Sequence, residues 1–286
     1  MIKELYFLPP DIAAYLRRLG VDPLKYSRLL HPELPPSPTA YSMPHVKESL
    51  DLLVHAHLFH VPFENLDIYD LRREPSLAIP EVFDKIVTRQ RGGYCFELNA
   101  LFFALLEGLG FQAYPITQRV LREGEFPPVC HRAAVETLEE TGERLLCDVG
   151  FGGPAPVGAL YLDRPEVQTS GKRKFRFDTD PQRGLHRLIL VEETAETPLF
   201  LFSDAPVDPV DFVPLNTYMT FNATSRFHNN RVLNLLREDG SVAIDNDVLR
   251  IHSDGQLQEI PIRSQEELKK ICVEYFHMPE ESLAEL

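Results

Sequence analysis

The sequence lacks the marks of a membrane or secreted protein. No apolar run approaches the roughly 18 residues that a membrane span requires. The N-terminus, MIKELYFLPPDIAAYL, has neither the long apolar stretch nor the small-residue cleavage site of a signal peptide. Four cysteines in 286 residues are too few for a disulfide framework. We therefore expect a cytoplasmic protein in which each cysteine is free, buried or catalytic.

Positive charge is also scarce. The chain has 29 Lys and Arg against 43 Asp and Glu, a net charge of −14. This balance disfavours nucleic acid and anionic membranes as partners, and we expect neither. The 44% hydrophobic and 25% charged content is ordinary for a soluble globular protein. No internal repeat is present, and the length suits two or three structural units.

The order of predicted elements indicates an α+β fold. Apolar residues recur at helical spacing in the first 87 residues, and residues 94–109 give the strongest helical pattern. From about 111 to 200, short alternating runs between turn-formers predict an antiparallel sheet or barrel. Residues 211–262 are predicted to add strands, and 265–275 a closing helix.

The candidate nucleophile is Cys95, in the segment RGGYCFELN. It follows a Gly-Gly pair and opens the strongest helix, where unsatisfied N–H groups carry a partial positive charge. That environment is expected to lower the thiol pKa and to offer donors to an oxyanion. Gly92 and Gly93 allow close approach of backbone or substrate. Taken alone, Cys95 could equally be a buried residue of the first turn.

A cysteine nucleophile needs a base, and the base needs a partner that fixes its tautomer. His131 lies in VCHRAAVE and Asp148 in LLCDVGF, two predicted strands of one hairpin. If the turn centres on Glu139 and Glu140, His131 and Asp148 lie directly opposite, with Cβ atoms about 4.5–5.5 Å apart. A turn centred two residues later would break this pairing. Each residue alone could be an ordinary strand or turn residue.

The remaining cysteines and the clustered histidines have simpler interpretations. Cys130 and Cys147 should point to the face of the hairpin opposite His131, as small apolar residues. Cys272, in the last predicted helix, should be a core residue. The closely spaced His55, His57 and His60 have no carboxylate or cysteine to complete a metal set, so we predict no metal.

Four segments together resemble the arylamine N-acetyltransferase family. RGGYCFELN resembles its active-site signature, and HVPFENLD resembles the segment that precedes it. CDVGFGGPAPVGALYL resembles the stretch around the catalytic aspartate, and LNTYMTFNATSRF a later cofactor-contacting segment. The match runs from about residue 11 to about residue 240, and four motifs in the correct order are far more specific than one.

The resemblance implies a fold and a mechanism. The expected fold is a helical domain over 1–110, a β-barrel over 111–205 and an α/β lid over 206–286, on a core related to papain-like cysteine proteinases and transglutaminases. The mechanism transfers acetyl from acetyl-CoA to an arylamine, an arylhydrazine or a related amine in ping-pong order. The resemblance makes Cys95 the acetylated nucleophile, His131 its base and Asp148 the orienting partner. Acetyl-CoA is a cosubstrate, and the protein is expected to be a monomer or a homodimer.

The resemblance also suggests residues for the two substrates. Phe63 and Phe151 match the aromatics that line the acceptor pocket. Tyr218, Thr224 and Ser225 match positions that contact CoA, although the usual Ser/Thr-Ser-Pro before Thr224 is Phe-Asn-Ala here. Anionic CoA needs local positive charge, for which the candidates are Arg226, Arg231 and Arg237. Without the family, Glu64 and Asn65 could simply form a helix cap and turn, and Arg91 could be a surface charge.

Four other functions remain open at this stage. A Cys-His-Asp triad also serves peptide hydrolysis and transglutamination. Amide synthases that close macrolactams resemble the same family and use another acyl donor. A protein that binds CoA or aromatics without turnover belongs to a different class, and the intact triad argues against it.

Overall fold

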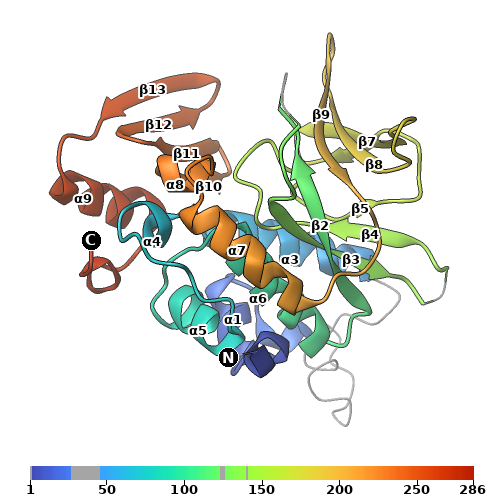
Figure 1. Ribbon diagram of the computed structural model, residues 1–286, viewed down its shortest axis with the longest axis horizontal. Helices are drawn as coiled ribbons and strands as arrows, with labels where there is room; N and C mark the ends of the chain where they lie inside the picture. The colour runs from blue at the N-terminus through green and yellow to red at the C-terminus, as the bar shows by residue number, and fades with distance from the viewer. Residues whose placement is uncertain (1, 27–45, 123–125, 140) are drawn as a thin grey trace.

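A computed structural model describes residues 2–26, 46–122, 126–139 and 141–286 (Figure 1). Its helices, short 3-10 and π-helical turns included, are η1 (Ile2–Tyr6), α1 (Ile12–Arg18), η2 (Pro23–Tyr26), α3 (Val46–His60), α4 (Leu66–Tyr69), α5 (Ile79–Phe83), η4 (Asp84–Thr88), α6 (Cys95–Gly108), η5 (Pro209–Asp211), α7 (Phe212–Phe221), α8 (Arg226–Asn229), α9 (Gln265–Phe276) and η6 (Glu280–Leu283). Its strands are β1 (Phe63–Glu64), β2 (Ala113–Val120), β3 (His131–Thr137), β4 (Arg144–Cys147), β5 (Leu160–Tyr161), β6 (Gln168–Ser170), β7 (Arg173–Thr179), β8 (His186–Val191), β9 (Glu196–Phe202), β10 (Val232–Arg237), β11 (Gly240–Asp245), β12 (Val248–Ser253) and β13 (Gln256–Pro261).

Helix α6 is the central helix of the first half of the chain. Every residue from Cys95 to Leu106 is buried, so all faces of its first three turns meet other elements. A helix that is apolar on all sides belongs inside a protein, which is why this segment gave the strongest helical pattern. It packs against α5, β2 and β3. The start of α6, and Cys95 with it, is thereby held between the helices and the larger sheet.

The larger sheet is nearly closed. Its eight strands run in the order β5-β4-β3-β2-β9-β8-β7-β6, and every pairing is antiparallel. The two edge strands meet through one side chain: Gln168 accepts a hydrogen bond from the Tyr161 amide and donates one to the Tyr161 carbonyl. Closing a sheet in this way removes exposed edges and gives it an apolar interior. Residues of β3, β7, β8 and β9 supply most of that interior.

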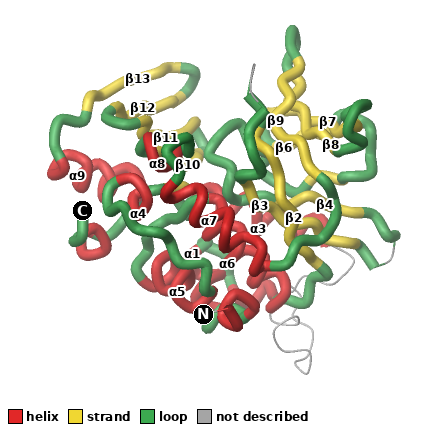
Figure 2. Tube along the Cα trace, viewed as in Figure 1, coloured by secondary structure: helices red, strands yellow, loops and turns green. Residues whose placement is uncertain are grey.

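A second sheet joins the two ends of the sequence. Its order is β1-β10-β11-β12-β13, with α9 packed on its apolar face. Figure 2 shows its outer strands and the larger sheet as two separate groups of strands, with most helices below and between them. The short strand β1 pairs with β10, Phe63 lying opposite Asn234. The segment that precedes the nucleophile is therefore part of a sheet built mainly from the last third of the chain.

The prediction of strands from residue 211 onward is wrong for its first part. Phe212–Phe221 is helix α7 and Arg226–Asn229 is the short helix α8. Aromatic and threonine residues in this segment favour strands, but propensity yields to packing. Phe212, Asn216, Met219 and Thr220 are buried at helical spacing, and Pro214 lies in the first turn, where it is tolerated. Strands begin only at Val232. Among the described residues, no helix combines the length and apolar character of a membrane span.

Asn65 ties the first half of the chain to α8 and β10. It is only 2% exposed and does not cap α4 through its side chain, contrary to the simple cap that its position suggested. Its Nδ2 donates to the carbonyls of Phe227 and Asn230 at 3.0 and 2.8 Å. Its Oδ1 accepts from the Val232 amide at 2.7 Å. One side chain thus satisfies three backbone groups of a distant segment.

Asn65→Ala is expected to lower the free energy of unfolding by about 2 kcal/mol or more, because it leaves three partly buried backbone groups unpaired. Urea denaturation followed by circular dichroism measures the loss. Asn229→Ala is the matched control, since the exposed Asn229 bonds only to carbonyls four and six residues away. A loss for Asn65→Ala no larger than for this control would contradict the structural role of Asn65.

Candidate active site

The loop before Cys95 runs closely against strand β1. The Glu64 amide donates to the Gly93 carbonyl at 2.9 Å, and the Gly93 amide donates to the Pro62 carbonyl at 3.3 Å. A Cβ atom on Gly92 would lie 2.0 Å from the Pro62 carbonyl oxygen, which no side chain can do. The Gly-Gly pair therefore serves close backbone approach, as the sequence predicted. This contact fixes the direction in which the chain enters α6.

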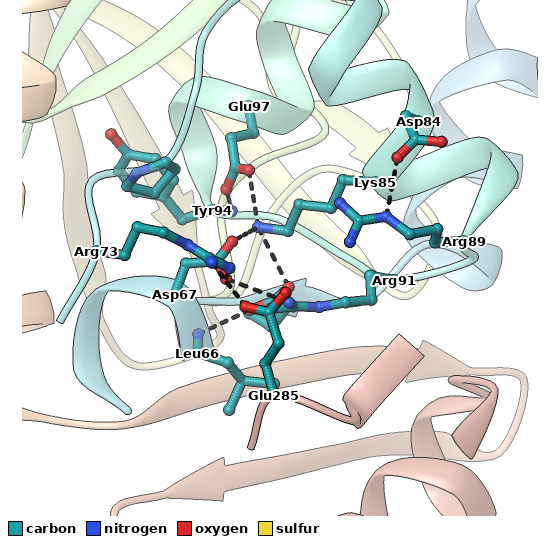
Figure 3. A network of polar contacts seen from close by, with 12 residues as sticks. Leu66, Asp67, Arg73, Asp84, Lys85, Arg89, Arg91, Tyr94, Glu97 and Glu285 are labelled. Carbon is teal, nitrogen blue, oxygen red and sulfur yellow. Dashed lines mark hydrogen bonds and ion pairs between the residues drawn. The ribbon is translucent and has the colours of Figure 1, made fainter. Parts of the chain in front are cut away.

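A buried network of charged side chains holds this loop in place (Figure 3). Lys85 lies at its centre, with Nζ 2.6 Å from Asp67, 2.8 Å from Glu97 and 3.4 Å from Glu64. Arg91 pairs with Glu64 at 2.7 Å and with Asp67 at 3.2 Å. All five side chains are at most 7% exposed. Arg91 is thus not the surface charge that its position alone allowed.

The two ends of this network cap helices. One oxygen of Glu97 accepts from the Tyr94 amide at 3.0 Å, at the N-terminus of α6. One oxygen of Glu64 accepts from the Leu66 amide at 2.7 Å, at the start of α4. A carboxylate at a helix N-terminus satisfies an orphan donor and complements the helix dipole. The carboxylates of Glu97 and Glu64, which pair with Lys85 and Arg91, therefore also hold the starts of α6 and α4. In this way they help to set the position of Cys95.

The network shifts the pKa values of its members in opposite directions. Burial alone would raise the pKa of Asp67, but Lys85 and Arg91 hold it well below its usual range. Burial opposes the charge on Lys85, yet the carboxylates of Glu64, Glu97 and Asp67 raise its pKa. Burial raises the pKa of Glu97 to about 7, against the pull of Lys85. Glu97 is thus the member for which ionisation is least favourable.

His131 and Asp148 form a buried hydrogen-bonded pair. His131 Nε2 lies 2.7 Å from Asp148 Oδ2, and the two residues are 2% and 6% exposed. The other oxygen, Oδ1, accepts from Asn99 Nδ2 at 2.9 Å and from the Gly150 amide at 2.8 Å. Three donors fix the carboxylate, and the carboxylate fixes the imidazole. This is the arrangement that a general base needs.

The pairing of His131 with Asp148 arises differently from the prediction. Ala134 lies opposite Cys147 in the hairpin, a register that would place Asp148 opposite Ala133. Direct opposition of His131 and Asp148 is therefore wrong, and Glu140, on which the predicted turn centred, lies outside the described residues. The contact forms because β4 ends at Cys147 and the chain turns at Asp148.

Asn99 links the helix of Cys95 to this pair, and the sequence analysis missed it. It lies one helical turn after Cys95, hence on the same face of α6. It donates to the Arg132 carbonyl at 2.5 Å as well as to Asp148, and it accepts from the Val149 amide at 3.0 Å. The spacing of four residues from the nucleophile was the available signal.

The thiol of Cys95 lies in a buried, crowded position. Cys95 is 2% exposed, and Sγ lies 3.6 Å from the Cys130 carbonyl oxygen. A Cβ on Gly150 would lie 2.8 Å from the Cys95 Cα, so only glycine fits there. Burial raises the pKa of the thiol, with Cys130 and Asp148 adding to the effect, although backbone N–H groups oppose it. The lowered pKa expected from the helix N-terminus is not found: burial outweighs it.

The two predicted acceptor aromatics pack against different rings, and Phe63 lies close to Gly152, the residue after Phe151. Phe151 is half-buried, and its ring centroid is 6.0 Å from that of His131 and 4.6 Å from that of Phe200. Phe200 also stacks on His131 at 5.2 Å. Phe63 is 7% exposed and packs against Phe227 at 5.7 Å. Phe200 was not predicted, because nothing in its strand distinguishes it from other core aromatics.

The residues suggested for CoA lie together at the end of α7. Tyr218 and Thr224 share a hydrogen bond of 3.1 Å at an exposed position. Ser225 is 3% exposed and its hydroxyl donates to the Met219 carbonyl at 2.6 Å. Arg231 is buried in an ion pair with Asp70, and the exposed Arg237 pairs with Asp239. Their contact with CoA stays a prediction.

Metal binding finds no support among the described residues, where no group of three or more His, Cys, Asp or Glu side chains could hold an ion. His57 is fully buried, between Tyr15 and Phe102. Burial lowers its pKa to about 3, so it is a neutral core residue. Cys147 and Cys272 are fully buried, and Cys130 packs against the helical core, as expected for small apolar residues.

The sequence of this chain is similar to those of known proteins. A sequence model of the N-acetyltransferase family matches residues 48–282. The arylamine N-acetyltransferase of Mycobacterium tuberculosis is 29% identical over 219 residues, which cover 73% of this chain and 74% of that protein. The proansamycin X synthase of Amycolatopsis mediterranei is 34% identical over 134 residues, 45% of this chain and 50% of that one.

Solved structures extend this agreement to the whole chain. The arylamine N-acetyltransferase of Mycobacterium smegmatis superposes with a TM-score of 0.80 at 26% identity, covering 96% of this chain and 94% of that one. The chain belongs to the arylamine N-acetyltransferase family. This confirms the family, the α+β fold and the enzyme class expected from the sequence, an acetyltransferase with acetyl-CoA as acyl donor.

Lys85→Met keeps the length of the side chain and removes its charge from among three carboxylates. We expect a loss of about 3–5 kcal/mol in the free energy of unfolding, because a buried ion network with one partner removed leaves uncompensated charge. Arg89→Met is the control: it breaks a pair with Asp84 whose side chains are 46% and 52% exposed. That loss should stay below about 1 kcal/mol. Equal losses in urea titrations would refute the special role of Lys85.

Glu97 should make stability depend on pH. Its pKa rises from an ordinary 4.5 to about 7 on folding, so the folded protein keeps a proton that the unfolded chain releases. The contribution of protonated Glu97 to the free energy of unfolding is complete below about pH 4.5 and is lost as the pH rises through about 7. Glu97→Gln removes this titration. Relative to wild type, the variant should therefore gain roughly 2–3 kcal/mol between about pH 5 and about pH 8.

Urea titrations of both proteins at the two pH values measure this gain, and other titrating groups cancel in the difference. The exposed Glu193→Gln serves as control and should differ little from wild type at either pH. A difference between Glu97→Gln and wild type that does not change with pH would show that Glu97 ionises normally in the folded protein.

Proposed function

We propose that this protein acetylates arylamines, arylhydrazines or related amines through an acetyl-Cys95 intermediate, with His131 as base and Asp148 as its orienting partner. The observation that carries this proposal is the buried 2.7 Å contact between His131 and Asp148, tied through Asn99 to the helix that Cys95 opens. Each group has the role that acyl transfer through a thiol requires.

The buried thiol explains why a base is needed. Because burial favours the protonated form of Cys95, the proton has to leave as the sulfur attacks the acetyl thioester. His131 takes that proton, and backbone N–H groups near the start of α6 receive the oxyanion. The tetrahedral intermediate collapses with cleavage of the bond to CoA sulfur, and His131 returns the proton to CoA. The acetyl group remains on Cys95.

The second half of the cycle reverses these roles. The amine attacks the thioester carbonyl, and His131 accepts a proton from the nitrogen. The bond to Cys95 breaks, and the proton returns to the sulfur. An arylamine or hydrazine suits this step because its nitrogen is largely neutral at pH 7. Phe63 and Phe151 are proposed to line the acceptor pocket, and Tyr218, Thr224 and Ser225 to contact CoA.

The setting of this activity is also part of the proposal. We propose a cytoplasmic location, where acetyl-CoA is available, and a monomer or homodimer as the working form. The functional division into residues 1–110, 111–205 and 206–286 is proposed with it, each part contributing to one boundary of the site.

A second candidate is an amide synthase, favoured by the similarity to the proansamycin X synthase over about half of each chain. It would use the same three catalytic residues with a different acyl donor. The acyl donor therefore discriminates between the two candidates.

The test is the intact mass of the protein after incubation with acetyl-CoA alone, beside Cys95→Ala. We expect a gain of one acetyl group on wild type only, and its release on addition of an arylamine. This result would establish donor, nucleophile and order of addition together. No gain, in protein whose thiol still reacts with a general alkylating agent, would reject acetyl-CoA as donor and favour the amide synthase.

A further inference from the structure

Among the four cysteines, all of which lie in the described residues, Cys130 differs from the rest in its exposure. Cys95, Cys147 and Cys272 are buried, whereas Cys130 is half-buried. It directly precedes the candidate base His131, the first residue of β3. Access as well as thiolate character decides which cysteine reacts. The thiol of Cys130 is therefore the first that a reagent from solution meets.

Cys130 and Cys95 are in direct contact. Sγ of Cys95 lies 3.6 Å from the Cys130 carbonyl oxygen, and the side chain of Cys130 packs against the helical core cluster to which Cys95 belongs. A carbonyl oxygen lies about 2.4 Å from its own Cα, so Sγ of Cys95 lies within about 6 Å of the Cys130 Cα. Cysteines that are far apart cannot be joined without backbone movement. Here the main chain of one residue already lies beside the thiol of the other, as a disulfide between them requires.

The backbone holds both residues in place. The Cys130 amide donates to the Gln118 carbonyl at 3.1 Å, next to the ladder that pairs β3 with β2. Cys95 is the first residue of α6, and Glu97 holds the start of that helix. The contact between the two cysteines is therefore built into the fold.

Two arginines lie near Cys130, in a chain whose net charge is −14. Burial raises the pKa of the Cys130 thiol, whereas the Val120 amide and the guanidinium groups of Arg122 and Arg119 oppose that rise. Arg119 also lies over the exposed ring of Phe126, 5.0 Å from its centroid. The arginines favour the thiolate of Cys130 more than burial alone allows, and they attract anionic reagents.

We propose that Cys130 is a site of thiolation by low-molecular-weight disulfides such as glutathione disulfide, and that Cys95 then displaces the bound thiol to form a disulfide with Cys130. Glutathione disulfide is anionic, which suits the arginines beside its point of entry. In the proposed cytoplasmic setting such a disulfide is transient, and it stops acyl transfer until a thiol reduces it. The inference rests on the proposed function, which supplies Cys95 as nucleophile and His131 as its base.

The reaction consists of two thiol–disulfide exchanges. In the first, the Cys130 thiolate attacks one sulfur of glutathione disulfide. The S–S bond of the reagent breaks, and one glutathione leaves and takes up the proton that Cys130 lost. In the second, Cys95 gives its proton to His131 and attacks the Cys130 sulfur. The mixed disulfide breaks, and the other glutathione leaves with the proton from His131. Two protein thiols are oxidised, and one glutathione disulfide is reduced to two glutathione molecules.

The test incubates the protein with glutathione disulfide and maps its thiols by mass spectrometry of peptides. We expect a cross-link between Cys95 and Cys130 in wild type. Acetyl transfer should fall about tenfold or more, because the nucleophile is consumed, and dithiothreitol should restore it. Cys130→Ala removes the entry thiol and should keep most of its activity after the same treatment. Cys272→Ala, the same change in the core of the second sheet, should cross-link like wild type. The activity of each variant before treatment shows that it is folded.

Three outcomes would overturn the proposal: no reaction, a mixed disulfide that persists on Cys130, or equal loss of activity in wild type and Cys130→Ala. Prior incubation with acetyl-CoA adds a further arm. Protein acetylated on Cys95 should stop at the mixed disulfide on Cys130, because the attacking thiol is blocked. If wild type forms the cross-link but accepts no acetyl group, the proposed function fails. If it accepts the acetyl group but forms no cross-link, only the role of Cys130 fails.

Discussion

The position of the nucleophile depends on the buried ion network around Lys85. Three carboxylates meet two buried cations there, and Arg73, half exposed, adds a third cation at the rim. Ion pairs of this kind need not stabilise a protein more than apolar packing would, because desolvation offsets much of the attraction. Their effect here is geometric. Each carboxylate that neutralises a cation also accepts from a backbone amide or pairs with a neighbouring cation, which ties the loop before Cys95 to the starts of α4 and α6.

The same network explains why distant parts of the chain converge on the site. Glu64 belongs to β1, which pairs with β10 of the second sheet. Asn65, the next residue, accepts from the first amide of β10. Tyr94, whose amide is held by Glu97, hydrogen-bonds through its hydroxyl to Asn216 of α7, the helix that Figure 1 shows running between the two sheets. A change in the network would therefore reach both the nucleophile and the segment proposed to bind CoA.

The sequence predicts best what local chemistry determines. A Gly-Gly pair before a cysteine at a helix start is compatible with few local structures. As predicted, Gly92 allows a close backbone approach and Cys95 begins a helix. The period-two pattern predicted the hairpin of His131 and Asp148, but not its register, because turn length decides register and the turn residues allowed several. Lys85 was not predicted to be buried, since lysine is almost never buried unless paired and its partners are distant in sequence. Residues 212–221 were predicted as strand because local propensity does not reflect the tertiary packing that makes this segment helix α7.

Some residues that violate local stability rules lie near the candidate triad, whereas others, such as His57 between Tyr15 and Phe102, lie elsewhere in the helical part of the chain. Glu97, at the start of the nucleophile's helix, is buried with a pKa of about 7. Gln118, opposite His131, has an unpaired amide, and the buried Arg132, next to His131, has an unpaired Nε. Natural proteins commonly break such rules at functional sites and compensate for them elsewhere. In this fold the compensation lies in the all-round burial of α6 and the nearly closed sheet. Both features restrict how the side chains around the triad can rearrange, because a closely packed interior leaves little room for movement.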